Sequence, residues 1–205
     1  MIYIIITTSI CNKIGVQNAV HREKRYRESI TQLLQIVKND PTIKVVIVEN
    51  NGYRETFLRV FDCDICYTEN NKFLFNHKGG NELLDMKQVI QHYNIQDDDM
   101  IIKLTGRYKL LNANFIEVVK RNPNYDAFVK FFNVCTKKYM FNDCVLGLFA
   151  VKCKYVKEFE YQFVQSAECE FAEYIRKNVE KTKIMEIEQL HLECCFADDL
   201  RILVV

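Results

Sequence analysis

The sequence is poor in the residues that interrupt regular structure. It has two prolines, six glycines and no tryptophan in 205 residues, and it contains no internal repeat. So little proline and glycine leaves no stretch that reads as a flexible linker, and we therefore expect one domain over residues 1–205. A domain of this length can bury roughly 70% of the surface that its unfolded chain exposes.

An excess of charge is also lacking, since 28 lysines and arginines face 27 aspartates and glutamates, a net charge of +1. No general field attracts nucleic acid or an anionic membrane, so neither is expected as a partner and any anion site must be local. The apolar segment 1–9 is too short for a secretory signal or a membrane span. Nine cysteines, an odd number, then indicate a reducing compartment, and we expect a cytoplasmic protein.

The order of apolar runs predicts an α/β fold with a mostly parallel central sheet flanked by helices, a GT-A-like (Rossmann-like) arrangement. Runs typical of strands buried on both faces are Ile2–Ile10, Lys44–Val48, Asp64–Thr68 and Met100–Tyr108. Helices are expected over Val16–Val37, over Glu55–Val60 and up to Tyr93. In the second half we expect helices over Phe115–Arg121, Val156–Phe163 and Ala167–Val179, with strands over Ala127–Val134, Cys144–Lys152, Ile184–Leu190 and Arg201–Val205.

The strand Met100–Tyr108 has an unusual end. Lys103, Thr105 and Arg107 would share one face of an extended chain, and Gly106 would let another group approach the backbone. Two cations at the end of a buried strand are costly unless they meet an anion, so we expect Lys103 and Arg107 to face a phosphate. The alternative is a strand end with two cations that reach solvent.

Polar side chains also follow the first two strands. Thr7, Thr8 and Ser9 end the first, and Glu49 and Asn50 end the second, at the sheet edge where α/β proteins bind ligands. The helix between them carries a strip of residues spaced by three and four positions, namely Arg22, Arg25, Tyr26 and Ser29. This strip is either part of the site or a solvated basic face.

Metal sites find little support. Cys63 and Cys66 lie three apart in a predicted strand and would point to opposite faces, so they cannot hold one zinc ion. Asp62–Asp64 and Asp97–Asp99 have the D-x-D spacing, but both precede their strands, whereas a metal at the ligand edge needs carboxylates after the strand. A solvated turn is the expected role of 97–99.

Glu168 is the candidate general base. It shares the inward stripe of its helix with Phe171, whereas Glu170 and Glu173 are expected to face outward. The alternative is a first-turn carboxylate that stabilises the helix dipole behind the possible cap Ser166.

The order of these features resembles nucleotide-sugar-dependent glycosyltransferases of the GT-A fold, in particular small enzymes of bacteria and large DNA viruses. The matching segments run from Ile2 to about Ile175: TTSI, a helix with R..RY..S, VIVENNG, YTENN…NHKGGNE and a strand led by aspartates. The resemblance implies a nucleotide-binding half over 1–110 and an acceptor and catalytic half over 111–205.

By this resemblance, particular residues take particular roles. Thr7, Thr8, Ser9, Glu49 and Asn50 would line the nucleoside pocket. Arg22 and Arg25 would reach the base or the phosphates, and the loop and helix start that hold uridine and sugar would be Lys78, Gly79, Gly80 and Asn81. Glu168 would match the base of inverting members.

The chain departs from the family where the metal-binding D-x-D normally lies, since that place reads KLTGRY. Dependence on Mn²⁺ or Mg²⁺ is therefore open, and Lys103 and Arg107, with Thr105 between them, would fit the role of basic groups on the diphosphate.

The sequence thus predicts a glycosyltransferase that moves a sugar from a nucleotide sugar, most simply a UDP-sugar, to a hydroxyl of a glycan or protein. Inversion follows if Glu168 is the base, and the location would be the host cytoplasm if the chain is viral. One alternative is a binding module that kept the fold and lost the chemistry. A nucleotidyltransferase is less well supported, because no metal-binding carboxylate pair or basic glycine-rich loop is visible near the N-terminus.

Overall fold

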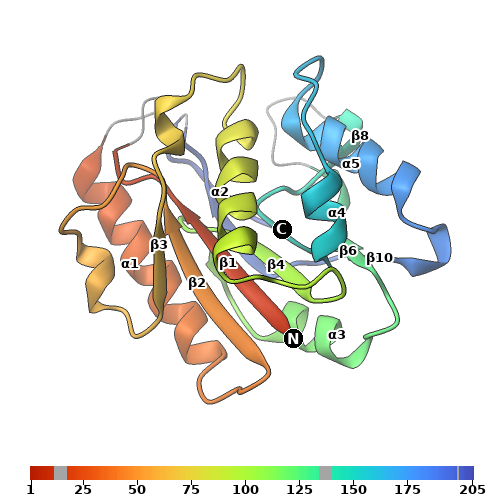
Figure 1. Ribbon diagram of the computed structural model, residues 1–205, viewed down its shortest axis with the longest axis horizontal. Coiled ribbons are helices and arrows are strands. Elements are labelled where there is room, and N and C mark those ends of the chain that lie inside the picture. The colour runs from red at the N-terminus through yellow and green to blue at the C-terminus, as the bar shows by residue number, and fades with distance from the viewer. Residues whose placement is uncertain (12–17, 134–139, 198) are drawn as a thin grey trace.

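A mostly parallel sheet of seven strands, in the order β10-β6-β9-β4-β1-β2-β3, forms the centre of the computed structural model, which describes residues 1–11, 18–133, 140–197 and 199–205 (Figure 1). Its strands are β1 (Ile2–Thr8), β2 (Ile43–Glu49), β3 (Asp64–Tyr67), β4 (Met100–Thr105), β6 (Ala127–Val129), β9 (Leu148–Lys152) and β10 (Ile184–Glu186). Only β9 runs against its neighbours, β4 and β6. The predicted fold class is therefore confirmed.

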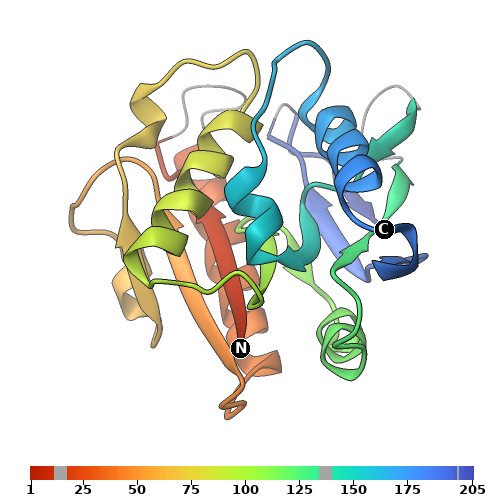
Figure 2. The same cartoon turned by 45° about the vertical axis from the view of Figure 1, so that its right-hand side comes forward.

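Helices cover both faces of the sheet, and two smaller sheets complete the fold (Figures 1 and 2). The helices are α1 (Ala19–Ile36), α2 (Gly79–His92), α3 (Asn114–Arg121), α4 (Cys153–Glu158) and α5 (Ala167–Asn178), with 3-10 turns η1 (Phe57–Val60), η2 (Asn70–Lys72) and η3 (Lys181–Lys183). The smaller sheets are β12 (Ile202–Val204), β11 (Leu192–Cys195) and β5 (Lys109–Leu110), and β7 (Phe131–Asn133) with β8 (Met140–Cys144).

Alternating side chains of the central strands feed two separate cores. Ile5 and Ile101 pack into the core under α2, α4 and α5, whereas Ile4 and Ile102 pack into the core under α1 and α3. Both faces of β1 and β4 are thus covered, which explains their unbroken apolar runs. Cys63 and Cys66 contribute to different cores, as the strand argument predicted.

Several boundaries differ from the sequence-based expectation. The predicted strand Cys144–Lys152 is two strands, because the chain turns at Val145–Gly147 between β8 and β9. The helix expected over Val156–Phe163 is α4, which ends at Glu158. The short strands β5 and β11, which pair with each other, were not predicted.

The start of β4 shows what Asp97–Asp99 do. Asp99 accepts a hydrogen bond from the N-terminal amine at 2.7 Å, and Asp97 pairs with Lys157 at 2.5 Å. Asp98 is largely exposed, with Lys152 3.5 Å away. These carboxylates lie at the amino end of β4, opposite the edge where β1 and β2 end.

Candidate functional site

A hollow opens at the carboxyl ends of β1 and β4. Its lining combines cations, amides, hydroxyls and a few apolar side chains. The lining residues are Thr7, Thr8, Ser9, Arg22, Tyr26, Asn50, Asn71, Phe73, Leu74, Phe75, Lys78, Asn81, Glu82 and Arg107. We call it the edge pocket. Three cations and one carboxylate make it locally positive in a chain of net charge +1.

Arg22 is the most informative side chain of the edge pocket. It projects from α1, is only 1% exposed, and its Nη2 donates to the Ser9 carbonyl oxygen at 2.7 Å and to the Tyr26 hydroxyl at 3.1 Å. Its Nε and Nη1 have no hydrogen-bond partner among the described residues. Burial lowers the pKa of Arg22, and the charge of Arg107 acts in the same direction. A buried guanidinium with unused donors suits an anionic ligand.

Arg107 also lines the pocket, from the turn that follows the end of β4. The chain turns after Thr105, where the Tyr108 amide donates to the Thr105 carbonyl oxygen at 2.8 Å. Gly106 is pressed against β1, and a Cβ on it would lie 2.9 Å from the Thr8 methyl group. Arg107 Nε donates to the Cys195 carbonyl oxygen at 3.3 Å, which ties the turn to β11.

The polar strip of α1 is buried, so its interpretation as a solvated basic face is wrong. Arg25 is 6% exposed and pairs with Glu193 at 2.7 Å, so it braces β11 and lies outside the pocket lining. Ser29 donates to the Gly106 carbonyl oxygen, and the Tyr26 hydroxyl accepts from the Ser9 amide at 3.1 Å. The strip thus locks α1 onto the turns that follow β1 and β4.

Glu49 lies beneath the pocket rather than in its lining. Its carboxylate is fully buried and accepts from the Thr8 hydroxyl at 2.7 Å and from the Ile10 amide at 3.2 Å. Arg54 contributes an ion pair at 3.3 Å. Glu49 therefore shapes the chain after β1, and Asn50 next to it faces the pocket.

Asn50 is held by a buried carboxylate on α2. Asp85 accepts from Asn50 Nδ2 at 3.1 Å, from the Thr68 hydroxyl at 2.6 Å and from Asn70 Nδ2 at 2.8 Å. Burial raises the pKa of Asp85 to about 6, although these three hydrogen bonds oppose the rise. The network links the turns after β2 and β3 to α2.

Lys103 does not face the pocket with Arg107, which corrects the sequence-based expectation. It points to the α2 side of β4, is 2% exposed, and pairs with Glu82 Oε2 at 2.6 Å. Its ammonium also donates to the Thr105 hydroxyl at 2.6 Å and to the Leu146 carbonyl oxygen at 2.8 Å. The expectation failed because the strand ends at Thr105, so the alternation that would place Arg107 beside Lys103 stops there.

The start of α2 packs closely against the loop before α5. A Cβ on Gly79 would lie 2.7 Å from Ala167, and one on Gly80 would lie 2.8 Å from the Phe75 ring. That ring stacks on Phe163 with centroids 5.1 Å apart and an interplanar angle of 4°. The loops that contain Phe75 and Phe163 meet beside the N-terminus of α2 (Figure 2). We call this contact the aromatic clasp.

Glu170 anchors one half of the clasp, whereas the sequence analysis placed it outward. It is 8% exposed and accepts from the amides of Gln162 and Val164 at 2.7 Å and of Gln165 at 3.0 Å. Burial acts to raise its pKa, but these hydrogen bonds outweigh it and the pKa of Glu170 is lowered. Helical periodicity could not predict this, because the Glu170 carboxylate bonds to the loop that precedes its own helix.

Glu168 is half-buried on the first turn of α5, behind the cap Ser166, whose hydroxyl accepts from the Cys169 amide at 3.2 Å. It is not among the residues that line the edge pocket. Its charge acts on Tyr161, whose pKa is raised well above the ordinary value, first by burial and then by Glu82, Cys144 and Glu168. Tyr161 thus lies near both Glu82 and Glu168.

The structure gathers about half of the predicted site residues around one hollow. Those in the lining are Thr7, Thr8, Ser9, Arg22, Asn50, Lys78, Asn81 and Arg107. Those outside the lining are Arg25, Glu49, Gly79, Gly80, Lys103, Thr105 and Glu168. The sequence analysis missed Glu82 and the apolar run Phe73–Phe75; three apolar residues in an otherwise polar loop were the available signal.

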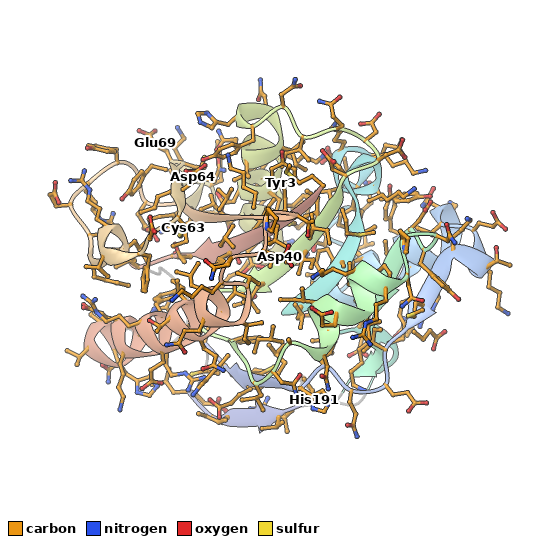
Figure 3. All side chains as sticks on the ribbon, turned by 90° about the horizontal axis from the view of Figure 1, so that it is seen from below. Tyr3, Asp40, Cys63, Asp64, Glu69 and His191 are labelled. Carbon is orange, nitrogen blue, oxygen red and sulfur yellow. The ribbon has the colours of Figure 1, made fainter. Side chains whose placement is uncertain are left out.

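The donor set of the pocket does not fit the divalent metal that many GT-A enzymes use. Glu82 is the one carboxylate among the lining residues, where it is outnumbered by Arg22, Lys78 and Arg107. Among the described residues no three His, Cys, Asp or Glu side chains gather to hold an ion. Asp64 of the D-x-D segment 62–64 and His191 lie at opposite sides of the molecule, so these two side chains cannot share an ion (Figure 3).

Comparison with known proteins shows the fold. No family model and no curated protein matches the chain. A protein from Desulfovibrio desulfuricans G20 described as a nucleotide-diphospho-sugar transferase has a TM-score of 0.54 at 8% identity, over 91% of this chain and 79% of that one. S. aureus TarS has a TM-score of 0.54 at 11% identity, over 91% of this chain and 35% of that one. Mannosyltransferase PcManGT from Pyrobaculum calidifontis, in complex with GDP-Man and Mn²⁺, has a TM-score of 0.54 at 9% identity, over 91% of this chain and 54% of that one.

This chain therefore has the fold of nucleotide-diphospho-sugar transferases and spans about a third of TarS and half of PcManGT. TarS 1-349 has also been solved with UDP-GlcNAc. None of the helices described here is long and apolar enough to cross a membrane.

Proposed function

We propose that the protein is a glycosyltransferase that takes a sugar from a nucleotide sugar, most simply a UDP-sugar, and transfers it to a hydroxyl of a glycan or protein. The observation that carries this proposal is Arg22, a buried guanidinium with two unused donors in a hollow at the carboxyl edge of a nucleotide-sugar transferase fold. A diphosphate offers the paired oxygens that such a group binds in bidentate fashion.

The nucleoside is assigned to the end of the pocket formed by β1 and β2. Thr7, Thr8 and Ser9 end one strand, and Asn50 follows the other. Thr7 Oγ1 is buried and has no partner among the described residues, so it can donate to or accept from a ligand. Asn50 is oriented by Asp85 and presents an amide edge of the kind that recognises a base.

The diphosphate is assigned to the space between Arg22 and Arg107. As the bond between the sugar and the diphosphate breaks, its electron pair stays on the departing oxygen and negative charge grows there. Two fixed guanidinium groups stabilise that charge more in the transition state than in the ground state. Lys103 takes no part in this step, since Glu82 already neutralises it.

The acceptor is assigned to the α5 side, within the half 111–205. Its hydroxyl oxygen attacks the anomeric carbon and forms the new bond as the old one breaks, and Glu168 takes the hydroxyl proton. This single displacement inverts the configuration. Glu168 stays a prediction, supported by its half-buried position near Tyr161.

The second candidate is a binding module that holds a nucleotide sugar without transferring it, which the missing D-x-D favours. Incubation with a panel of UDP- and GDP-sugars, with and without EDTA, distinguishes the two by release of nucleoside diphosphate. We expect release from one donor that survives EDTA. Binding without release would identify the module, and activity lost in EDTA and restored by Mn²⁺ would contradict the arginine-based mechanism.

A further inference from the structure

Glu82 is the one carboxylate that lines the edge pocket. A carboxylate repels a diphosphate but accepts hydrogen bonds from hydroxyl groups, which both the ribose and the sugar of a nucleotide sugar carry. It lies on the first turn of α2, and its side chain is 27% exposed. It also lines a second, mostly apolar hollow between α2, β4 and α5. Glu82 therefore lies between a polar hollow and an apolar one.

The position of Glu82 is fixed by Lys103. Lys103 forms an ion pair with Glu82 Oε2 at 2.6 Å, and its ammonium donates hydrogen bonds to the Thr105 hydroxyl at 2.6 Å and to the Leu146 carbonyl oxygen at 2.8 Å. Glu82 Oε1 has no hydrogen-bond partner among the described residues, so it remains available as an acceptor. A buried lysine whose donors are all used is a rigid support for a carboxylate.

Strand order shows which part of a ligand Glu82 would meet. The proposed nucleoside position is over β2 and β1, and Arg107 follows β4. Lys103 links β4 to Leu146, in the turn that leads into β9 on the far side of β4. Glu82 is thus placed beyond the diphosphate as seen from the nucleoside, where the sugar of a nucleotide sugar lies.

From these contacts we propose that Glu82 accepts a hydrogen bond from a hydroxyl of the donor sugar and determines sugar specificity, and that Lys103 is its positioning residue. This inference rests on the proposed function. A partly buried carboxylate built to accept a hydroxyl rejects an analogue that lacks it, because its oxygen is then left without a partner.

The test compares UDP with the UDP-hexoses by titration calorimetry, because UDP carries everything except the sugar. In Glu82→Gln we expect the affinity for UDP to stay within about twofold and the affinity for the UDP-hexose that the wild type prefers to fall by roughly tenfold or more. Lys103→Met should also lower the affinity for that UDP-hexose relative to the affinity for UDP. Glu160→Gln and Lys87→Met, which break an ion pair between α2 and the segment after α4, outside the pocket, should leave both affinities unchanged.

Retained binding of UDP also reports that a variant is folded. Glu82→Gln leaves a buried lysine without its counter-ion, so the double variant Glu82→Gln/Lys103→Met serves if the single one does not fold. Equal loss of UDP and UDP-hexose affinity would place Glu82 at the ribose or in the scaffold and overturn the inference. So would unchanged affinity for both, and in either case the proposed function would stand. A wild type that binds no UDP-hexose and no UDP would overturn both.

Discussion

At the scale of single residues, Arg22 is kept in a position that costs stability. Its guanidinium is buried, two of its nitrogens have no partner among the described residues, and Arg107 adds repulsion. Such an arrangement is retained where a ligand supplies the missing anion.

Arg22→Met should therefore lower the affinity for UDP by roughly 10- to 100-fold without lowering the melting temperature of the free protein, because the ligand contact is lost but so is the buried charge. Arg27→Met is the matched control, since Arg27 is on the same helix but pairs with Glu23 at the surface. Calorimetry and thermal unfolding would measure both effects. A variant that binds UDP normally would contradict the diphosphate assignment.

Asp85 predicts a pH dependence of stability. Its pKa is about 6 in the folded chain, above the ordinary 3.8, chiefly because of burial. The stabilisation is therefore fully present below about pH 4 and is lost as the pH rises through 6. The free energy of unfolding of the wild type, relative to Asp85→Asn, should fall by about 3 kcal/mol between pH 3 and pH 7. Chemical denaturation at several pH values measures it.

The exposed Asp98 provides the control for this comparison, and Asp98→Asn should follow the wild-type profile. A difference between wild type and Asp85→Asn that stays flat with pH would show that Asp85 titrates normally.

Glu168→Gln keeps the shape of the side chain and removes its basicity. If Glu168 is the base, turnover should fall by roughly 100-fold or more with donor affinity nearly unchanged. Glu173→Gln, on the exposed side of the same helix, is the matched control. Normal turnover in Glu168→Gln would leave Glu168 with a role at the helix start only.

At the scale of elements, the start of α2 is fixed by the aromatic clasp. Gly79 and Gly80 let the helix approach Ala167 and Phe75. On the other side, Phe163 adopts a φ of 59°, and Glu170 holds the amides on both sides of it. A bulky residue with positive φ is uncommon and persists only where its surroundings impose it.

Gly80→Ala should destabilise the protein by roughly 1–3 kcal/mol, because its Cβ would displace the Phe75 ring from its stack. In a Phe75→Ala background the same change should cost less, because the Phe163 ring, 3.0 Å from the added Cβ, is then the nearest remaining obstacle. A double-mutant cycle from denaturant unfolding measures this coupling. Equal effects in both backgrounds would exclude the contact with Phe75.

At the scale of the whole molecule, a nearly neutral chain concentrates cations in one hollow. Arg22, Lys78 and Arg107 come from α1, the start of α2 and the turn after β4, so a ligand between them would join segments that are distant in sequence. Binding at this edge should therefore stabilise the entire fold.

UDP at about 100 times its dissociation constant should raise the free energy of unfolding by about 2.7 kcal/mol, which corresponds to roughly 5–10 °C in melting temperature for a domain of this size. A thermal shift series would measure it, with uridine as the control that lacks the diphosphate. If uridine raised the melting temperature as much as UDP does, the contacts between the diphosphate and the arginines would contribute little to the binding energy.

The sequence by itself determined the fold class, because unbroken apolar runs that alternate with helices can only be buried in a covered, mostly parallel sheet. It also predicted that polar residues such as Thr7, Thr8 and Asn50, which follow buried strands directly, would meet at one edge of the sheet, and all three line the edge pocket. The opposite faces of Cys63 and Cys66 followed from strand geometry alone.

Only the tertiary structure decided which charges meet. Lys103 and Arg107 are four residues apart in sequence, yet the turn after Thr105 sends them to different partners. Arg25 forms an ion pair with Glu193, and Glu170 accepts hydrogen bonds from the loop before its own helix. Local periodicity predicts which face of an element a residue occupies. The partner on that face, however, comes from segments distant along the chain. Glu82 was therefore identified as a site residue only from the packing of α2 on β4.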